Sequence, residues 1–220
     1  MQRNPRHTTQ EGGFRMKNWM QSAIVMAVAV ALSCAMAHAQ TDVALSGYGT
    51  FTSSTSGFGT QQTPHNSAGG MLEVRHIVNP LIGFEFAYSF NPANQSYAPK
   101  TGACDFVCGD PPLTVNGNAS QVGGNWVVSF PKGNIRPFAL GGAGFLITLP
   151  TGISPYTINT VVRPVFVYGG GLDWSFLPHF GLRLQVRGNM SKAPNLSNLY
   201  TSTTQYTQIY EPMGGVFYRF

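Results

Sequence analysis

Charged residues are scarce in this chain of 220 residues. Lys, Arg, Asp and Glu make up 10% of it, against about 25% of a typical soluble domain. Beyond residue 39, no stretch reaches the roughly 20 consecutive apolar residues of a membrane helix. The basic residues do not cluster, so the footprint of a nucleic-acid-binding protein is absent. What the chain has instead, 26 glycines and 12% aromatic residues, favours short alternating strands over helices.

The first 39 residues have the pattern of a leader. Basic residues precede an apolar run at 23–34, and Ala-His-Ala at 37–39 follows as a cleavage site. A basic start, an apolar centre and an A-x-A site predict a secretory signal peptide over residues 1–39. The true start of translation is then either Met1 or Met16. A lipoprotein anchored at Cys34 is the alternative, but the residues before Cys34 make a poor acylation motif.

Residues 40–220 divide into eight alternating segments, separated by polar or turn-forming breakers. The predicted strands are 42–52, 70–78, 81–90, 119–130, 135–149, 161–176, 181–191 and 205–220. Their connections alternate between long and short. An even number of strands with short turns at one end and long loops at the other is typical of outer-membrane barrels. In a soluble eight-stranded barrel such as a lipocalin, this alternation of long and short connections is not expected.

The last segment, QYTQIYEPMGGVFYRF, alternates with period two and stops on an aromatic residue. In this terminal strand, its strand count and its loop pattern, the chain resembles the small OmpA/OmpX-like outer-membrane β-barrels. The resemblance implies an all-β fold, an eight-stranded antiparallel up-and-down transmembrane β-barrel in the bacterial outer membrane. It also implies that Tyr218 and Phe220 belong to the signal read by the barrel-assembly machinery. Outer-membrane lipid and lipopolysaccharide are the other expected partners, and the barrel is expected to be a monomer.

The predicted strands have one aromatic and one small or charged face. In segment 81–90 the aromatic face carries Phe84 and Phe86, and we expect it to face lipid. Charges on the other face would then meet inside a narrow lumen. Simple hairpin registers place Arg75 opposite Glu85, Asp173 opposite Arg183 and Arg187 opposite Glu211. The predicted lumen network consists of Glu73, Arg75, Glu85, Arg163, Asp173, Arg183, Arg187 and Glu211. The faces of segments 42–52 and 135–149 stay unassigned, because their alternation is weak.

Chemistry-bearing motifs are few. Cys104 and Cys108 lie in a long loop, where an exported protein would form a loop-closing disulfide. No phosphate loop, dinucleotide fingerprint or metal cluster stands out, and no cofactor is expected. The stretch 189–195 resembles the motif region of outer-membrane lipid A deacylases, also eight-stranded barrels. That family needs a histidine as general base where this chain has Asn189, so deacylation is not expected.

The expected function is therefore non-enzymatic, a structural or surface-interaction role carried by the extracellular loops. A narrow channel is the first alternative, although eight strands usually leave no continuous water path. A lipid A-modifying enzyme is a weaker one. A lipocalin-like binder would need the aromatic face to line the cavity.

Overall fold

The structure is a computed structural model that describes residues 40–57, 60–99, 113–130, 132–151, 160–194, 196 and 205–220. The predicted signal peptide lies outside the described residues and stays a prediction. In the described part, no helix is long and apolar enough to cross a membrane.

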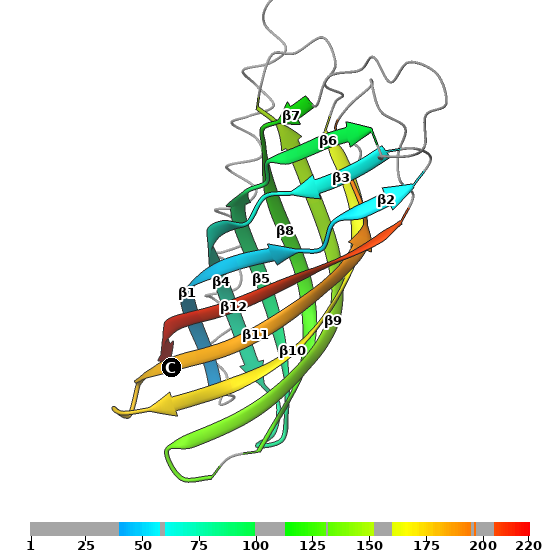
Figure 1. The fold of residues 1–220 in the computed structure, drawn as a ribbon. Coiled ribbons are helices and arrows are strands. Elements are labelled where there is room, and N and C mark those ends of the chain that lie inside the picture. The colour runs from blue at the N-terminus through cyan, green and yellow to red at the C-terminus, as the bar shows by residue number, and fades with distance from the viewer. Residues whose placement is uncertain are drawn as a thin grey trace, which may run out of the picture. The chain divides into compact units, whose positions relative to one another are not determined.

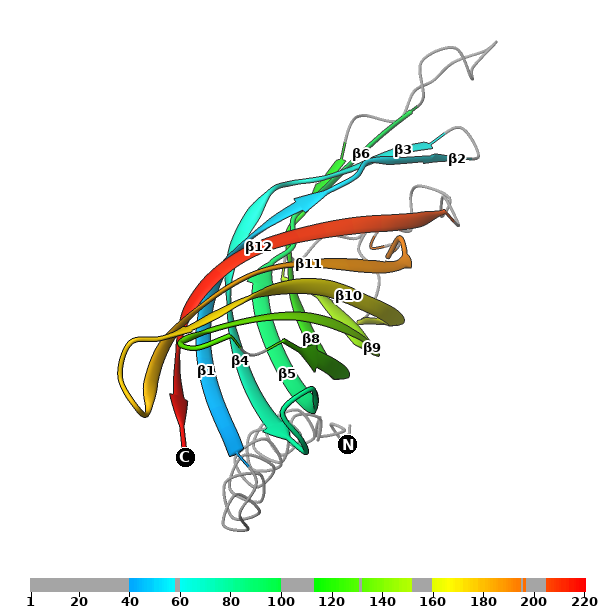
Figure 2. The same ribbon diagram turned by 90° about the horizontal axis from the view of Figure 1, so that it is seen from below.

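Eight antiparallel strands form a closed barrel (Figures 1 and 2). They are β1 (Gln40–Thr52), β4 (Ser67–Ile77), β5 (Ile82–Pro92), β8 (Gly117–Ser129), β9 (Ile135–Pro150), β10 (Val161–Ser175), β11 (Phe180–Lys192) and β12 (Tyr206–Arg219). Each wall strand pairs with its neighbour in the chain's order around the wall, and β1 pairs with β12 to close it. The predicted eight-stranded up-and-down barrel is confirmed.

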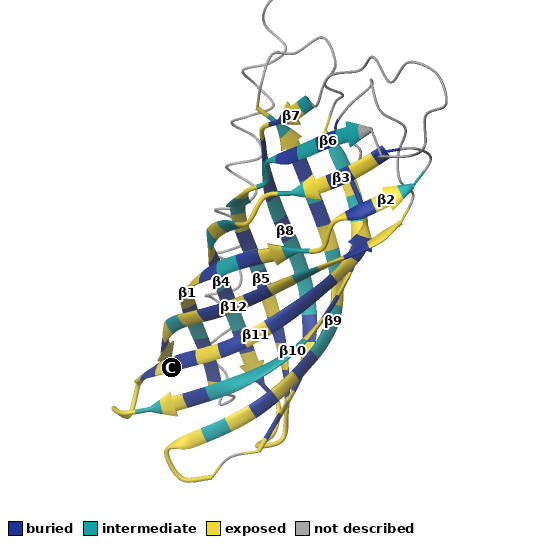
Figure 3. Cartoon of the chain, in the orientation of Figure 1, coloured by how far each residue is buried: buried dark blue, intermediate teal, exposed yellow. Residues whose placement is uncertain are grey.

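The alternation of the sequence sets the two surfaces of the wall. Along each strand, buried and exposed residues follow one another with a period near two, which Figure 3 shows as alternating bands. Along β11, for example, Leu182, Leu184 and Val186 are exposed, whereas Arg183, Gln185 and Arg187 are buried. Apolar side chains therefore cover the outside. The inside holds most of the polar and charged side chains, together with buried apolar ones such as Phe138, Val165 and Val167.

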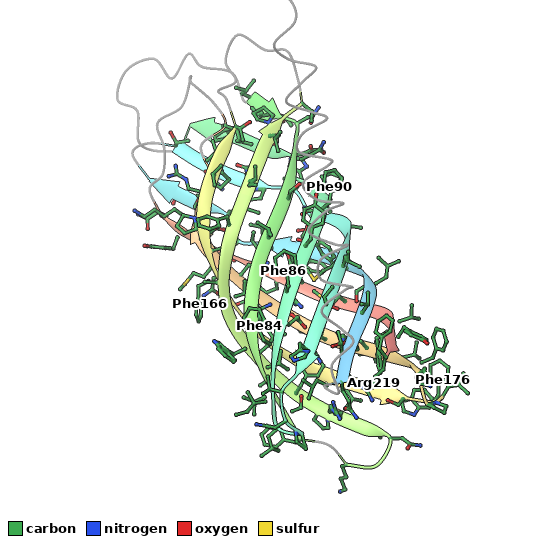
Figure 4. The ribbon with its side chains drawn as sticks, turned by 180° about the vertical axis from the view of Figure 1, so that it is seen from behind. Phe84, Phe86, Phe90, Phe166, Phe176 and Arg219 are labelled. Carbon is green, nitrogen blue, oxygen red and sulfur yellow. The ribbon has the colours of Figure 1, made fainter. Side chains whose placement is uncertain are left out.

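The outer surface is rich in aromatic side chains. Figure 4 shows Phe84, Phe86 and Phe90 of β5 and Phe166 of β10 on the outside of the wall, and each is more than 40% exposed. Where β10 turns into β11 and β12 ends, Trp174 packs against Phe176, and Tyr218 packs against Phe180 and Phe220. Aromatic residues gathered near both ends of an apolar band are typical of a wall that faces lipid.

Three tight turns lie at one end of the barrel, which we call the short-turn end. They join β4 to β5, β8 to β9 and β10 to β11, and both ends of the described chain lie there too. In the β8–β9 turn, Gly133 has a φ of 62°, a left-handed conformation in which glycine avoids the steric cost of a Cβ atom. We call the opposite end of the barrel the long-loop end.

A second sheet of four short strands continues the wall at the long-loop end. Its strands are β2 (Thr55–Gly57), β3 (Thr60–Pro64), β6 (Gln95–Pro99) and β7 (Leu113–Val115), paired in that order. The sequence analysis assigned these residues to loops, and that was wrong. β2, β3 and β6 are mostly polar, and β7 has only three residues, Leu113–Val115, so hydrophobic periodicity could not identify these segments.

Inside the wall, close approach between strands requires small residues. A Cβ atom at Gly142 of β9 would overlap the backbone oxygen of Gly124 in β8. This contact gives one physical reason for the many glycines in the tightly curved wall.

Candidate functional site

Seven charged side chains from five strands meet in the middle of the described lumen. They form the ionic cluster, which consists of Asp42, Glu73, Arg75, Glu85, Asp173, Arg183 and Arg187. No side chain of the cluster is more than 1% exposed. Burying charge is costly unless each charge is paired, and here every member has at least one partner of opposite sign.

The predicted hairpin registers occur in the structure. Arg75 lies opposite Glu85, and Asp173 lies opposite Arg183. The Nη2 atom of Arg75 lies 2.7 Å from Glu85 Oε2, and Arg183 Nε lies 2.7 Å from Asp173 Oδ1. These are charge-assisted hydrogen bonds of ordinary length.

Two ion pairs bridge opposite walls of the barrel. Arg75 of β4 reaches Asp173 of β10, with 3.0 Å between Nη1 and Oδ2. Arg187 of β11 reaches Glu85 of β5, with 2.6 Å between Nη2 and Oε1. In the closed order of eight strands, β4 and β10 are four positions apart, and so are β11 and β5. The two pairs therefore cross the full width of the lumen.

Aromatic rings fill the lumen beside the cluster. The guanidinium of Arg75 lies 4.2 Å from the ring centre of Phe138, and that of Arg183 lies 5.4 Å from the ring centre of Phe217. Both rings are almost fully buried. Cation–π contacts of this kind add attraction without adding charge, and the rings occupy space that water would otherwise fill.

Asp42 belongs to the cluster although the sequence analysis left it out. Its Oδ1 atom accepts a hydrogen bond from Arg183 Nη2 at 2.8 Å, and its side chain is fully buried. The alternation of residues 42–52 was too weak to assign a face. The missing signal is barrel closure: the seam between β1 and β12, together with the β1–β4 register, places Asp42 opposite Arg219 on one side and Arg75 on the other.

Two residues of the predicted network lie outside the cluster. Arg187 and Glu211 are opposite each other in the β11–β12 register, but Arg187 pairs with Glu73 and Glu85 instead. Glu211 forms no ion pair with a described residue. The same is true of Arg163, which is half-buried near the long-loop end of β10. The register was right, and the expectation that each inward carboxylate meets an arginine was wrong for Glu211.

Between the cluster and the long-loop end lies a cavity, which we call the cup. The side chains that line it are mainly hydroxyls and amides, with a few apolar groups, among them Thr50, Ser89, Gln121, Leu146, Thr148, Ser191, Thr207 and Ile209. Glu211 and His65 are its ionisable lining residues in the described part, and the lining contains no Lys or Arg. About 50 Å³ of the cup is open to the centre of a water molecule.

The segment after β11 forms part of the wall of the cup. The backbone oxygen of Pro194 accepts hydrogen bonds from Gln62 Nε2 at 2.8 Å and from the Tyr97 hydroxyl at 3.3 Å. The Leu196 amide donates to the Tyr97 hydroxyl at 2.9 Å. Tyr97 and Leu196 pack together with Val115 in a small apolar cluster. The second sheet thus holds the segment that follows β11 across the cup.

Two polar residues of the deacylase-like stretch face inward. Asn189 and Ser191 are both buried on the lumen side of β11, and Ser191 lines the cup. Neither side chain is presented to the outer, apolar surface where a lipid substrate would lie.

The remaining predicted residues are placed as follows. Cys104 and Cys108 lie outside the described residues, so their disulfide stays a prediction. Tyr218 and Phe220 lie at the short-turn end, where their exposed rings contact each other at a centroid distance of 5.0 Å.

Comparison with known proteins identifies the architecture. Neither protein-family models nor curated protein sequences give a match. Among solved structures, Neisserial surface protein A is similar with a TM-score of 0.57, at 12% identity over 82% of this chain and 97% of that one. OprG of Pseudomonas aeruginosa gives a TM-score of 0.54, at 13% identity over 83% and 96%. Ail of Yersinia pestis, in complex with a heparin analogue, gives 0.52, at 15% identity over 83% and 99%. The chain therefore has the fold of the bacterial eight-stranded outer-membrane β-barrels.

Proposed function

We propose that this protein is a non-enzymatic outer-membrane barrel with a closed lumen, which acts through the cup and the second sheet at its extracellular end. The observation that carries the proposal is the pair of ion bridges between opposite walls, Arg75–Asp173 and Arg187–Glu85. A lumen crossed by buried ion pairs and packed with buried rings leaves no water path for a solute.

The orientation follows from the unequal ends of the barrel. Outer-membrane barrels have short periplasmic turns and longer extracellular loops. The short-turn end is therefore periplasmic, and the cup opens toward the cell surface. The closed order of the wall strands leaves no unpaired wall edge, which supports a monomer surrounded by outer-membrane lipid and lipopolysaccharide.

The similar structures support a surface role without defining the ligand. One is called a surface protein and another an attachment protein bound to a heparin analogue. A heparin analogue is a polyanion, whereas the cup has a carboxylate, Glu211, and no Lys or Arg in its lining. Recognition of sulfated sugars is therefore not what the cup of this chain favours.

Conductance in a planar bilayer tests the closed lumen. The refolded residues 40–220, shown to be folded by a mobility difference between boiled and unboiled samples, should give no discrete current steps. The double variant Arg75→Ala/Asp173→Ala removes one cross-lumen bridge without changing the net charge, and it should open a conducting path.

Arg163→Ala is the matched control, because Arg163 also sits on the lumen-facing side of its strand but lies outside the ionic cluster. It should stay as silent as the wild type. Reproducible steps from the wild-type barrel would contradict the proposal and favour a narrow channel.

A further inference from the structure

We propose that the cup binds a small, soluble primary amine, with the Glu211 carboxylate as the counter-charge of the ammonium group. The inference rests on the proposed function, because it names the class of ligand that the extracellular cup takes. It is carried by Glu211, by the neutral groups around it and by the size of the cup.

Glu211 is a buried carboxylate without a cation. It is 4% exposed, and its Oε2 atom has no hydrogen-bond partner among the described residues. The nearest arginine in register, Arg187, is directed to Glu73 and Glu85 and does not line the cup. A buried carboxylate of this kind either takes up a proton or is stabilised as the anion by a group that supplies the opposite charge and the missing hydrogen bonds.

The charge balance of the lumen agrees with this view. In the described part, the fully buried charged residues are five carboxylates and three guanidiniums, an excess of two negative charges. The half-buried Arg136 and Arg219 lie at the short-turn end, opposite Asp173 and Asp42 in register. They lie beside the ionic cluster and not beside the cup. At the long-loop end, the half-buried Arg163 is on the lumen-facing side of β10, but it does not line the cup and forms no ion pair with Glu211.

The groups around Glu211 favour an ammonium ion over a divalent metal. No group of three or more His, Cys, Asp or Glu residues that could hold a metal occurs in the described part, and metal cations of high charge prefer several carboxylates. The lining instead supplies neutral hydroxyls and amides, among them Thr50, Ser89 and Gln121. Such acceptors match the three N–H donors of a primary ammonium group.

The size of the cup limits the ligand. About 50 Å³ open to water centres corresponds to about four water molecules, at roughly 10–15 Å³ each. That is the size of 2-aminoethanol, which has four non-hydrogen atoms. Leu146 and Ile209 line the cup beside the polar groups and can contact a short carbon chain.

A ligand-observed NMR titration with 2-aminoethanol tests the proposal on the folded protein in detergent micelles at neutral pH. The wild type should bind it with a Kd on the order of 1 mM. Ethylene glycol, which has the same size and no charge, should bind at least ten-fold more weakly. Glu211→Gln keeps the shape of the side chain and should also weaken amine binding at least ten-fold.

Lys132→Gln is the charge control, since it also changes the net charge by one unit and Lys132 lies in the β8–β9 turn at the short-turn end, outside the lining of the cup. It should bind the amine as the wild type does. The inference is overturned if ethylene glycol binds equally well, if Glu211→Gln keeps its affinity, if both variants lose affinity alike, or if folded wild type shows no binding at ten times the expected Kd. Conductance is measured separately, so a silent barrel that ignores the amine overturns this inference alone, whereas a conducting barrel overturns the proposed function.

Discussion

Replacing Arg75 by methionine tests whether the ionic cluster is dry. Arg75 donates from Nε and Nη2 to Glu85 Oε2, at 3.2 and 2.7 Å, and from Nη1 to Asp173 Oδ2 at 3.0 Å. Methionine retains much of the volume beside the Phe138 ring but none of these bonds. The cluster of four carboxylates would then hold two arginines instead of three.

The expected loss is about 3–5 kcal/mol, the usual cost of removing one partner from a buried ion pair. With a urea m-value of about 2 kcal/mol/M, the unfolding midpoint should fall by about 1.5–2.5 M. Tryptophan fluorescence and the boiled-versus-unboiled gel shift, both followed along the same urea series in lipid, measure it. The second probe shows whether the loss of fluorescence reports unfolding of the barrel.

The double variant Arg75→Met/Glu85→Gln separates charge from packing. It removes one charge of each sign, and the amide at position 85 can still accept from Arg187 and Asn125, which now donate to Glu85 Oε1. We expect it to regain at least half of the stability lost by the single variant. If Arg75→Met alone costs less than about 1 kcal/mol, water already solvates these charges. The lumen would then be wet, and the closed-lumen function would be wrong.

Four further predictions concern the wall, the second sheet and the terminus. Leu184→Arg places a charge on the outer surface, where Leu184 is 61% exposed. If this position lies near the bilayer midplane, the change should lower the free energy of unfolding in lipid vesicles by about 2–4 kcal/mol. Unchanged folding would show that this face does not meet lipid. Burial raises the pKa of Tyr97 to about 12, above its usual value near 10. The neutral hydroxyl therefore stabilises the second sheet fully below about pH 10, and this contribution is lost as the pH rises toward 12. Limited proteolysis between these pH values should show the loss in the wild type and not in Tyr97→Phe. Gly142→Val should prevent closure of the barrel, because its side chain would overlap the Gly124 backbone, and the protein should then show no gel shift. Deleting Phe220 should reduce assembly in cells while leaving refolding in detergent intact, and equal assembly would contradict its role as an insertion signal.

The fold could be predicted because most wall strands show the same alternation of apolar and polar residues. Segment 181–191 puts Leu182 and Leu184 on one side and Arg183 and Arg187 on the other, and a shift of one residue would reverse both faces. Turns of fixed length then set which residues face each other across a hairpin. Arg75–Glu85 and Asp173–Arg183 follow from these two facts alone.

The candidate site could be predicted only in part, because its decisive contacts cross the barrel. Hairpin register says which residues are adjacent, but the reach of Arg187 to Glu85 depends on the diameter and stagger of the closed wall. The prediction therefore paired Arg187 with its hairpin neighbour Glu211, whereas in the structure Arg187 forms an ion pair with Glu85 on the opposite wall. Asp42 was missed for the same reason, since its ion-pair partner, Arg183, lies on β11, two strands away from β1 around the wall.

The preference of Arg187 for the opposite wall is what links the closed lumen to the cup. Arg187 pairs with Glu73 and Glu85 together, in addition to the pairs that Arg183 forms with Glu73 and Arg75 forms with Glu85. By turning toward them it closes the lumen and leaves Glu211 unpaired above the closure. A barrel sealed in this way leaves a carboxylate at the bottom of the cup, and a ligand of the opposite charge can reach it from the long-loop end only.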